Sequence, residues 1–212
     1  MKKVKDILPS IFYLLLFTSV LGLIVYSILN IDTIKSSNTF KKVFGEKVSK
    51  TYELEKGVNF IGVDFNSKFK ASRILKENEN LTLIADYDDN EWENIVKSSS
   101  KRATEGKDFR LNEYRGYLII ASEDSTITLD GRRFNDISKL ELDKGLNLIG
   151  GIEYLSSDTI ISEFKNSGID VLGVTTWNNS TSMFLSNIIE NGEIYGDILK
   201  IEENDGVFIN IQ

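Results

Sequence analysis

Three oxygen-bearing side chains at alternate positions are the first residues of this chain that could bind a ligand. Asp86, Asp88 and Asn90 match the first three ligand positions of a Ca²⁺-binding loop, because a hard cation prefers oxygen donors. The match then ends, since Glu91 stands where such a loop needs glycine and Lys97 stands where it needs a bidentate glutamate. We interpret the stretch as a solvated hairpin tip, with a weak cation site as the alternative.

Aromatic residues offer a second kind of binding chemistry. Two tryptophans and several tyrosines could form a platform for sugar rings, with the nearby acids bonding to sugar hydroxyls: Trp92, Trp177, Tyr87, Tyr114 and Tyr117. On short strands, Trp and Tyr more often fill a core or pack at a hairpin tip. Packing is therefore the first interpretation, and a glycan platform is the alternative.

The composition excludes several kinds of catalytic site. The 212 residues include no Cys and no His, which excludes disulfides, thiol nucleophiles, zinc–thiolate sites and imidazole-based triads. Acidic residues are numerous enough to supply a glycosidase carboxylate pair, but no two stand at a defined spacing beside an apolar floor. A glycine-rich phosphate loop is also absent. We expect no catalytic residue, no metal and no cofactor.

These candidate residues belong to a pattern that occurs twice. Residues 52–62 (YELEKGVNFIG) align with residues 140–150 (LELDKGLNLIG). Farther along each copy, residues 115–120 (RGYLII) align with residues 205–210 (DGVFIN). Because both motifs recur in the same order and at nearly the same spacing, the sequence predicts two copies of one supersecondary unit.

Four glycines mark equivalent positions in the two copies. Gly57 and Gly116 are 59 residues apart, and Gly145 and Gly206 are 61 residues apart. Glycine can take positive φ angles and lets another strand approach closely, because it has no side chain. We interpret all four as structural turn glycines.

Hydrophobic periodicity predicts the same elements in each copy. Apolar alternation followed by a buried run predicts two strands around Gly57 and around Gly145. Short helical patterns follow near residues 71–75 and 160–164, and hairpins are predicted over 81–96 and 171–185. Asp130-Gly131 predicts a further tight hairpin turn.

The N-terminal region predicts attachment to a membrane. Residues 7–31 contain no charge, and a helix of that length crosses a hydrocarbon core of about 30 Å. The run is longer than the apolar region of a cleavable signal peptide, so an uncleaved anchor is expected, with a buried globular helix as the alternative. Three lysines in residues 1–6 favour a cytoplasmic N-terminus and extracytoplasmic domains.

The predicted fold class is an N-terminal transmembrane helix followed by an α+β, mostly β ectodomain, with two tandem repeats and one short helix in each. The predicted division is a cytoplasmic tail (1–6), a transmembrane anchor (7–31), a tether (32–42), a first β-rich repeat (43–121) and a second β-rich repeat (122–212). The net charge is −7; residues 1–30 contribute +2, so the residues after position 30 carry −9. Nucleic acid is therefore not an expected partner, because its phosphates need a basic face.

The ordered motifs resemble a known repeat family. The succession LEKGVNFIG, a short helix, a strand ending in DYDDNEW, and FRLNEYRGYLIIASEDSTITLDG is similar to repeats with the consensus G-W-N-L-I…G-Y-W-I…T-L-T-L-x-G of bacterial and archaeal secreted and cell-surface proteins. The resemblance covers most of residues 52–212. Val58 and Leu146 replace the first Trp of the consensus, Leu118 and Phe208 replace the second, and the second copy has no counterpart of the last strand.

This resemblance implies small, mostly β domains in a modular envelope or adhesion protein without assigned catalytic residues. We therefore predict a single-pass membrane-anchored surface protein whose repeats serve binding, adhesion or scaffolding, without catalysis. Two alternatives stay open: an ectodomain that binds or processes envelope polysaccharide, and a bitopic subunit of an envelope complex. The predicted ligand or glycan contacts are Trp92, Trp177, Tyr87, Asp86 and Asp88.

Overall fold

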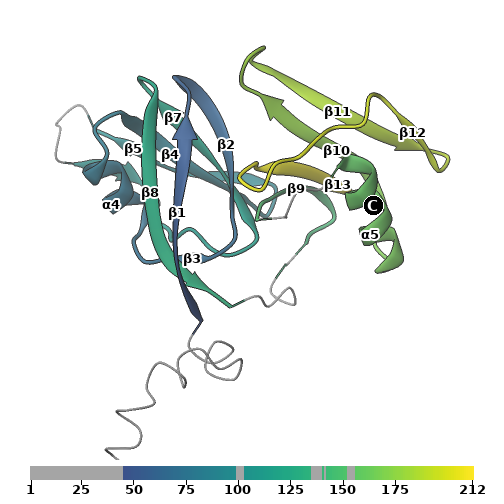
Figure 1. Ribbon diagram of the computed structural model, residues 1–212, viewed down its shortest axis with the longest axis horizontal. Coiled ribbons are helices and arrows are strands. Elements are labelled where there is room, and N and C mark those ends of the chain that lie inside the picture. The colour runs from purple at the N-terminus through teal and green to yellow at the C-terminus, as the bar shows by residue number, and fades with distance from the viewer. Residues whose placement is uncertain (1–44, 99–102, 135–139, 141, 152–155) are drawn as a thin grey trace, which may run out of the picture. The chain divides into compact units, whose positions relative to one another are not determined.

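The computed structural model describes residues 45–98, 103–134, 140, 142–151 and 156–212 (Figure 1). The chain divides into two units, Met1–Gly45 and Glu46–Gln212, and all the elements below belong to the second. We refer to residues 46–134 as the first half of this unit and to residues 140–212 as its second half.

The two halves contain the same kinds of elements. The first half consists of β1 (Glu46–Leu54), β2 (Gly57–Val63), β3 (Asn66–Ser67), α4 (Ala71–Glu77), β4 (Leu81–Asp88), β5 (Glu91–Lys97), β6 (Thr104–Gly106), β7 (Arg115–Ala121) and β8 (Ser125–Arg133). The second half consists of β9 (Gly145–Ile149), α5 (Ser157–Asn166), β10 (Val171–Asn178), β11 (Met183–Glu190), β12 (Glu193–Tyr195) and β13 (Val207–Ile211). The predicted β-rich character is confirmed.

Strand order repeats between the halves. A small sheet has the order β1-β8-β3, and a larger sheet has the order β12-β11-β10-β13-β9-β7-β4-β5-β6, with β2 also pairing with β7 (Figure 1). The first half thus runs β6-β5-β4-β7-β2 and the second runs β12-β11-β10-β13-β9. Each first-half strand of the larger sheet therefore has a counterpart in the second half, and α4 corresponds to α5, whereas β3 has no counterpart among the described residues.

The predicted fold class requires a correction. It joined a transmembrane helix to the β-rich part, but the two helices within the described ranges have seven and ten residues, and neither is long and apolar enough to cross a membrane. Residues 7–31, to which the transmembrane helix was assigned, lie outside the described residues. The fold that the structure supports is a β-rich unit with two short helices.

One predicted turn is also wrong. Residues 125–133 form a single continuous strand, β8, so Asp130-Gly131 does not make a hairpin turn. β8 pairs along its whole length with β1, from Glu46 opposite Arg133 to Leu54 opposite Ser125. The strand that follows residue 121 therefore belongs to the small sheet of the first half.

The same pair of hydrogen bonds from an asparagine side chain to the backbone closes the turn before β2 and the turn before β9. The Asn59 side chain accepts a hydrogen bond from the Glu55 amide (2.9 Å) and donates to the Glu55 carbonyl (2.8 Å). Asn147 makes the same two bonds with Asp143, both at 2.8 Å. Gly57 and Gly145 share a φ of 103°, which glycine adopts without strain. The shared G-x-N motif thus encodes one turn twice.

Replacing Asn59 with Ala is expected to lower the free energy of unfolding by about 2 kcal/mol, because the Glu55 amide and carbonyl lose their partner in a buried site. Asn59 is only 2 % exposed. Asn147→Ala is the matched variant, and we expect about half that loss because Asn147 is only half-buried. Urea unfolding measures both values. A loss for Asn147→Ala equal to or larger than that for Asn59→Ala would contradict this explanation.

Two hydrophobic cores lie on one face of the larger sheet. In the first half, α4 and the small sheet cover this core, and β1 and β8 contribute Tyr52, Leu54, Ile127 and Leu129. In the second half, Ile160 of α5 packs with side chains of β9, β10 and β13. Leu140 and Leu142, which align with Tyr52 and Leu54, are only partly buried there. The first core therefore has a fuller cover than the second.

Candidate functional site

The two halves meet through equivalent backbone positions. Ile61 of β2 bridges to Asp205, just before β13, and Ile149 of β9 bridges to Arg115, at the start of β7. Each contact is the counterpart of the other, because β9 corresponds to β2 and β13 to β7. This reciprocity is that of an isologous interface, formed here within one chain.

Two glycines lie where the halves cross. The Gly62 amide donates to the Asn204 carbonyl (2.7 Å), and the equivalent Gly150 amide donates to the Tyr114 carbonyl (3.2 Å). A Cβ added to Gly62 would lie 2.7 Å from the Gly150 Cα, which no real side chain tolerates. The backbones of the two halves therefore touch, and only glycine fits at both positions.

An aromatic cluster fills the other face of the larger sheet at this junction. Its six rings come from both halves: Phe60, Tyr87, Trp92, Trp177, Phe184 and Phe208. Phe208 is only 6 % exposed, and its ring centre is 5.3 Å from that of Phe60. The Trp177 indole donates to the Val58 carbonyl across the junction (3.1 Å). Trp92 and Phe184 remain about half exposed at its edge, at 44 % and 50 %.

The geometry of the aromatic cluster suits packing better than sugar binding. Its rings meet at interplanar angles of 54° to 76°, tilted or edge-on, so no two rings share a flat exposed face. Tyr117 is not part of it, because this side chain is fully buried in the first core, where burial also raises the pKa of its hydroxyl. The predicted glycan contacts Trp92, Trp177 and Tyr87 therefore come together, but mainly to join the halves.

Arg115 forms ion pairs with two of the residues predicted to bind a cation. Arg115 donates to the Asp86 carboxylate (3.0 Å) and to the Asp88 carboxylate (2.9 Å). Asp86 is buried, and burial raises its pKa above the usual range although the Arg115 guanidinium opposes the shift. The side-chain oxygen of the third predicted ligand, Asn90, lies next to Gly145. These residues form an internal ion-pair network and do not assemble the predicted loop.

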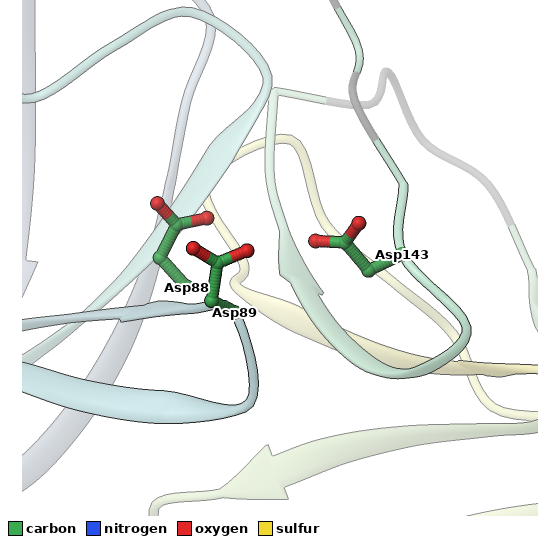
Figure 2. A group of neighbouring side chains, drawn as sticks. All are labelled: Asp88, Asp89 and Asp143. Atoms are coloured by element: carbon green, nitrogen blue, oxygen red, sulfur yellow. The ribbon is translucent and has the colours of Figure 1, made fainter.

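A different set of acids comes together at the tip of the β4–β5 hairpin. Figure 2 shows Asp88 and Asp89 from this tip facing Asp143, which lies in the segment before β9. One carboxylate oxygen of each lies within 4.8 Å of the others, and all three residues are exposed. Ca²⁺ takes six to eight oxygen ligands, and Asp88 already binds Arg115. At most, these carboxylates could hold a hydrated cation weakly.

Sequence reasoning missed Asp143, and no spacing in the chain could have revealed it. Strands β5 to β8 lie between Asp89 and Asp143 in the chain. Only the contact between the halves brings the two residues together. Within the described ranges, the aligned residue of the first copy, Glu55, does not belong to a comparable group of carboxylates.

The outer hairpins of the two halves differ most in the residues they expose. Trp92 of β5 lies opposite Tyr87, and Phe184 of β11 lies opposite Trp177. Because Tyr87 and Trp177 are equivalent, Trp92 corresponds to Phe184, and this pair aligns β5 with β11. In this alignment Met183 and Leu185 replace Glu91 and Glu93. The next pairing aligns β6 with β12, so Ile194 and Tyr195 replace Thr104 and Glu105.

We call β11 and β12 the second-half hairpin. Its large apolar side chains are 39 % to 60 % exposed: Met183, Phe184, Leu185, Ile188, Ile194 and Tyr195. β12 also stands at the end of the strand order of the larger sheet. Exposed apolar side chains on an edge strand are unusual, because natural sheets generally protect their edges with charge or cover.

A groove lies between α5 and the second-half hairpin. It encloses about 490 Å³ over apolar side chains that include Ile161, Leu172, Ile189 and Ile194. Asp158, Asp170 and Lys165 also line it. In the first half, Lys97 takes the place of Ile189, and its ammonium group donates to the carbonyls of Asn78 (2.8 Å) and Glu79 (3.0 Å) at the end of α4. The second-half groove has no such lysine.

Searches of protein families, of curated proteins and of solved structures gave no match to this chain. The resemblance to the G-W-N-L-I repeats therefore stays a prediction from the sequence motifs.

Proposed function

We propose that this protein is a non-catalytic binding or scaffolding module, and that its second-half hairpin docks an extended segment of a partner protein. The observation that carries the proposal is the contrast between two hairpins of the same topology. The first half builds its outer hairpin with Glu91, Glu93, Thr104 and Glu105, whereas the second exposes apolar residues at the same positions. Folding alone therefore does not require those apolar residues.

The edge strand favours a partner that binds as an added strand. β12 can offer the main-chain groups of its outer edge, and a strand that pairs there would lie beside Ile194 and Tyr195, with Ile188 one strand farther in. Such pairing takes its affinity from main-chain hydrogen bonds and its specificity from alternate side chains. Aromatic residues and Met are also enriched in the cores of protein interfaces.

Charge around the surface indicates the chemistry of the partner. Glu190 and Glu193 pair at the turn of the second-half hairpin, and Asp158 and Asp170 line the adjacent groove. Lys165 is the cation among the residues that line this groove. A second copy of this chain would bring like charges together, which is unfavourable. An apolar strand flanked by basic residues fits better.

Site-specific photocrosslinking tests the proposal in the cells that make this protein. A crosslinker at Tyr195 should capture one discrete partner, and the same crosslinker at the equivalent Glu105 should not. A second experiment places the crosslinker at Ile188 and introduces the four residues of the first half: Met183→Glu, Leu185→Glu, Ile194→Thr and Tyr195→Glu. This fourfold variant should no longer crosslink to the partner. Equal crosslinking at positions 195 and 105, or unchanged capture by the fourfold variant, would refute the proposal.

The fourfold variant should still fold, because the first half shows that this topology accepts those residue types. A reciprocal variant, Glu91→Met with Glu105→Tyr, is the matched control and should leave partner capture unchanged. Capture of a second copy of this chain would instead assign the hairpin to self-association and would contradict the proposed partner.

The predicted location outside the cytoplasm is part of this proposal. Protease added to intact cells is expected to digest the unit Glu46–Gln212. Full protection under conditions that cleave a known surface protein would refute that location.

A further inference from the structure

A second groove lies along the small sheet β1-β8-β3, which does not contain the strands of the second-half hairpin. It encloses about 790 Å³ and is lined by β1, β3, β8 and neighbouring residues. Four of its charged lining residues are cations, and one is an acid: Lys47, Lys68, Arg110, Arg132 and Asp130. This cationic groove occurs in a chain whose net charge is −7.

Some of these cations lie directly opposite another cation on the neighbouring strand, which is electrostatically unfavourable. Lys47 of β1 lies directly opposite Arg132 of β8. An isolated bridge outside the sheet also places Lys70 opposite Arg110, although Lys70 has Asp108 as an acidic partner (3.8 Å). Like charges directly opposite each other on antiparallel strands destabilise the pair. The stability of the sheet therefore does not explain why these cations are gathered here.

Two arginines elsewhere in the unit have acidic partners. Arg133, the neighbour of Arg132, pairs with Asp64. Arg115 pairs with Asp86 and Asp88. In contrast, Lys47, Lys68 and Arg110 are exposed and form no ion pair with any residue in the described ranges. The groove thus keeps positive charge available for an external anion.

We propose that this cationic groove binds a compact ligand that carries phosphate groups. Arginine binds phosphate through two parallel N–H bonds and lysine binds it as a point charge, so the groove offers both modes. Val48 and Phe134 add apolar surface to its lining. The ligand is expected to be compact, because the acidic remainder of the unit would repel a long polyanion. Both a free polyphosphate and a phospholipid headgroup have this chemistry.

Calorimetry with the full-length chain in a non-ionic detergent tests the proposal with two soluble probes. Tripolyphosphate represents a free polyphosphate, and glycerophosphoglycerol represents a lipid headgroup without its acyl chains. Binding of either probe supports the proposal, and the tighter probe identifies the source. The affinity should fall about tenfold when the salt concentration is raised from 50 to 500 mM, because exposed charges are screened.

Three variants locate the binding. Lys68→Gln combined with Arg110→Gln should lower the affinity for the bound probe by about tenfold or more, because two charge-assisted contacts are lost. Lys165→Gln on α5 removes one positive charge outside this groove, as Lys47→Gln does inside it, and should bind as the parent does. Lys47→Gln should weaken binding but raise the melting temperature, because it removes the charge opposite Arg132.

Opposite effects on affinity and stability distinguish a ligand site from a structural role, which would lower both. Absence of binding by both probes at 50 mM salt, or unchanged binding by the Lys68/Arg110 variant, would overturn the proposal. Binding of a single-stranded oligonucleotide through the same residues as tightly as tripolyphosphate would also overturn it, since the groove would then serve a long polyanion.

Discussion

Gly150→Ala is expected to destabilise the unit by about 3 kcal/mol, the upper end of the usual range for overpacking. A Cβ at this position would meet the Gly62 backbone and would lie 2.8 Å from the Arg115 carbonyl oxygen. All its near neighbours are backbone atoms, which cannot rotate away as a side chain could. The substitution should therefore push the two halves apart. Urea unfolding, followed by tryptophan fluorescence, measures the effect, because both tryptophans lie in the aromatic cluster at the junction.

Gly57→Ala is the control for this experiment, because its Cβ would meet nothing within 4 Å. Its φ of 103° is unfavourable for alanine, so we expect a loss of about 1–2 kcal/mol from backbone strain alone. Tryptophan emission of the folded Gly57→Ala variant should match that of the parent, whereas that of Gly150→Ala should shift. A Gly150→Ala variant as stable as the parent would show that the halves do not touch at Gly62 and Gly150.

Phe208→Ala is expected to lower the free energy of unfolding by about 3–5 kcal/mol, as for other large aromatic residues removed from a core. The Phe208 ring is nearly buried and packs against rings from both halves: Phe60, Tyr87, Trp92 and Phe184. Truncation would leave a cavity between them. Chemical unfolding should show the loss, and quenching of Trp92 and Trp177 by acrylamide should rise in the folded state because water reaches their rings.

Phe208→Leu is the matched control, because it removes the aromatic ring but keeps most of the buried side-chain volume. The first half has Leu118 at the equivalent position, so leucine is compatible with this strand. We expect a loss of only about 1–1.5 kcal/mol, because most of the buried volume is kept. If Phe208→Ala and Phe208→Leu had the same small effect, the aromatic cluster would not stabilise the junction.

The phosphate-binding groove and the partner-binding hairpin lie on different parts of the unit and are independent proposals. The groove uses cations of the small sheet, whereas the hairpin uses apolar residues of β11 and β12. The Lys68/Arg110 variant should therefore leave crosslinking at Tyr195 unchanged, and the fourfold hairpin variant should leave phosphate binding unchanged.

Local patterns in the sequence determined much of the secondary structure. Apolar runs interrupted by a polar tip predicted hairpins over 81–96 and 171–185, which are β4–β5 and β10–β11 although β11 continues to Glu190, and short helical patterns placed α4 and α5. The shared G-x-N motif forms the same turn in both halves, at Gly57 and at Gly145. These features depend on residues that are neighbours in the chain, so their periodicity is visible without a structure. The membrane helix predicted for residues 7–31 concerns residues outside the described part of the chain.

Only the tertiary structure decided which distant residues meet. β8 continued through Asp130-Gly131 because pairing with β1 along its whole length outweighed the local turn preference. Asp143 joined Asp88 and Asp89, and Lys47 came to lie opposite Arg132, through strand pairings and contacts between segments far apart in the chain. A linear pattern holds no signal for such contacts, because they arise from how two packed halves fit together. For that reason the apolar second-half hairpin became visible only by comparison with its first-half counterpart, and the cationic groove only from the strand pairings of the small sheet.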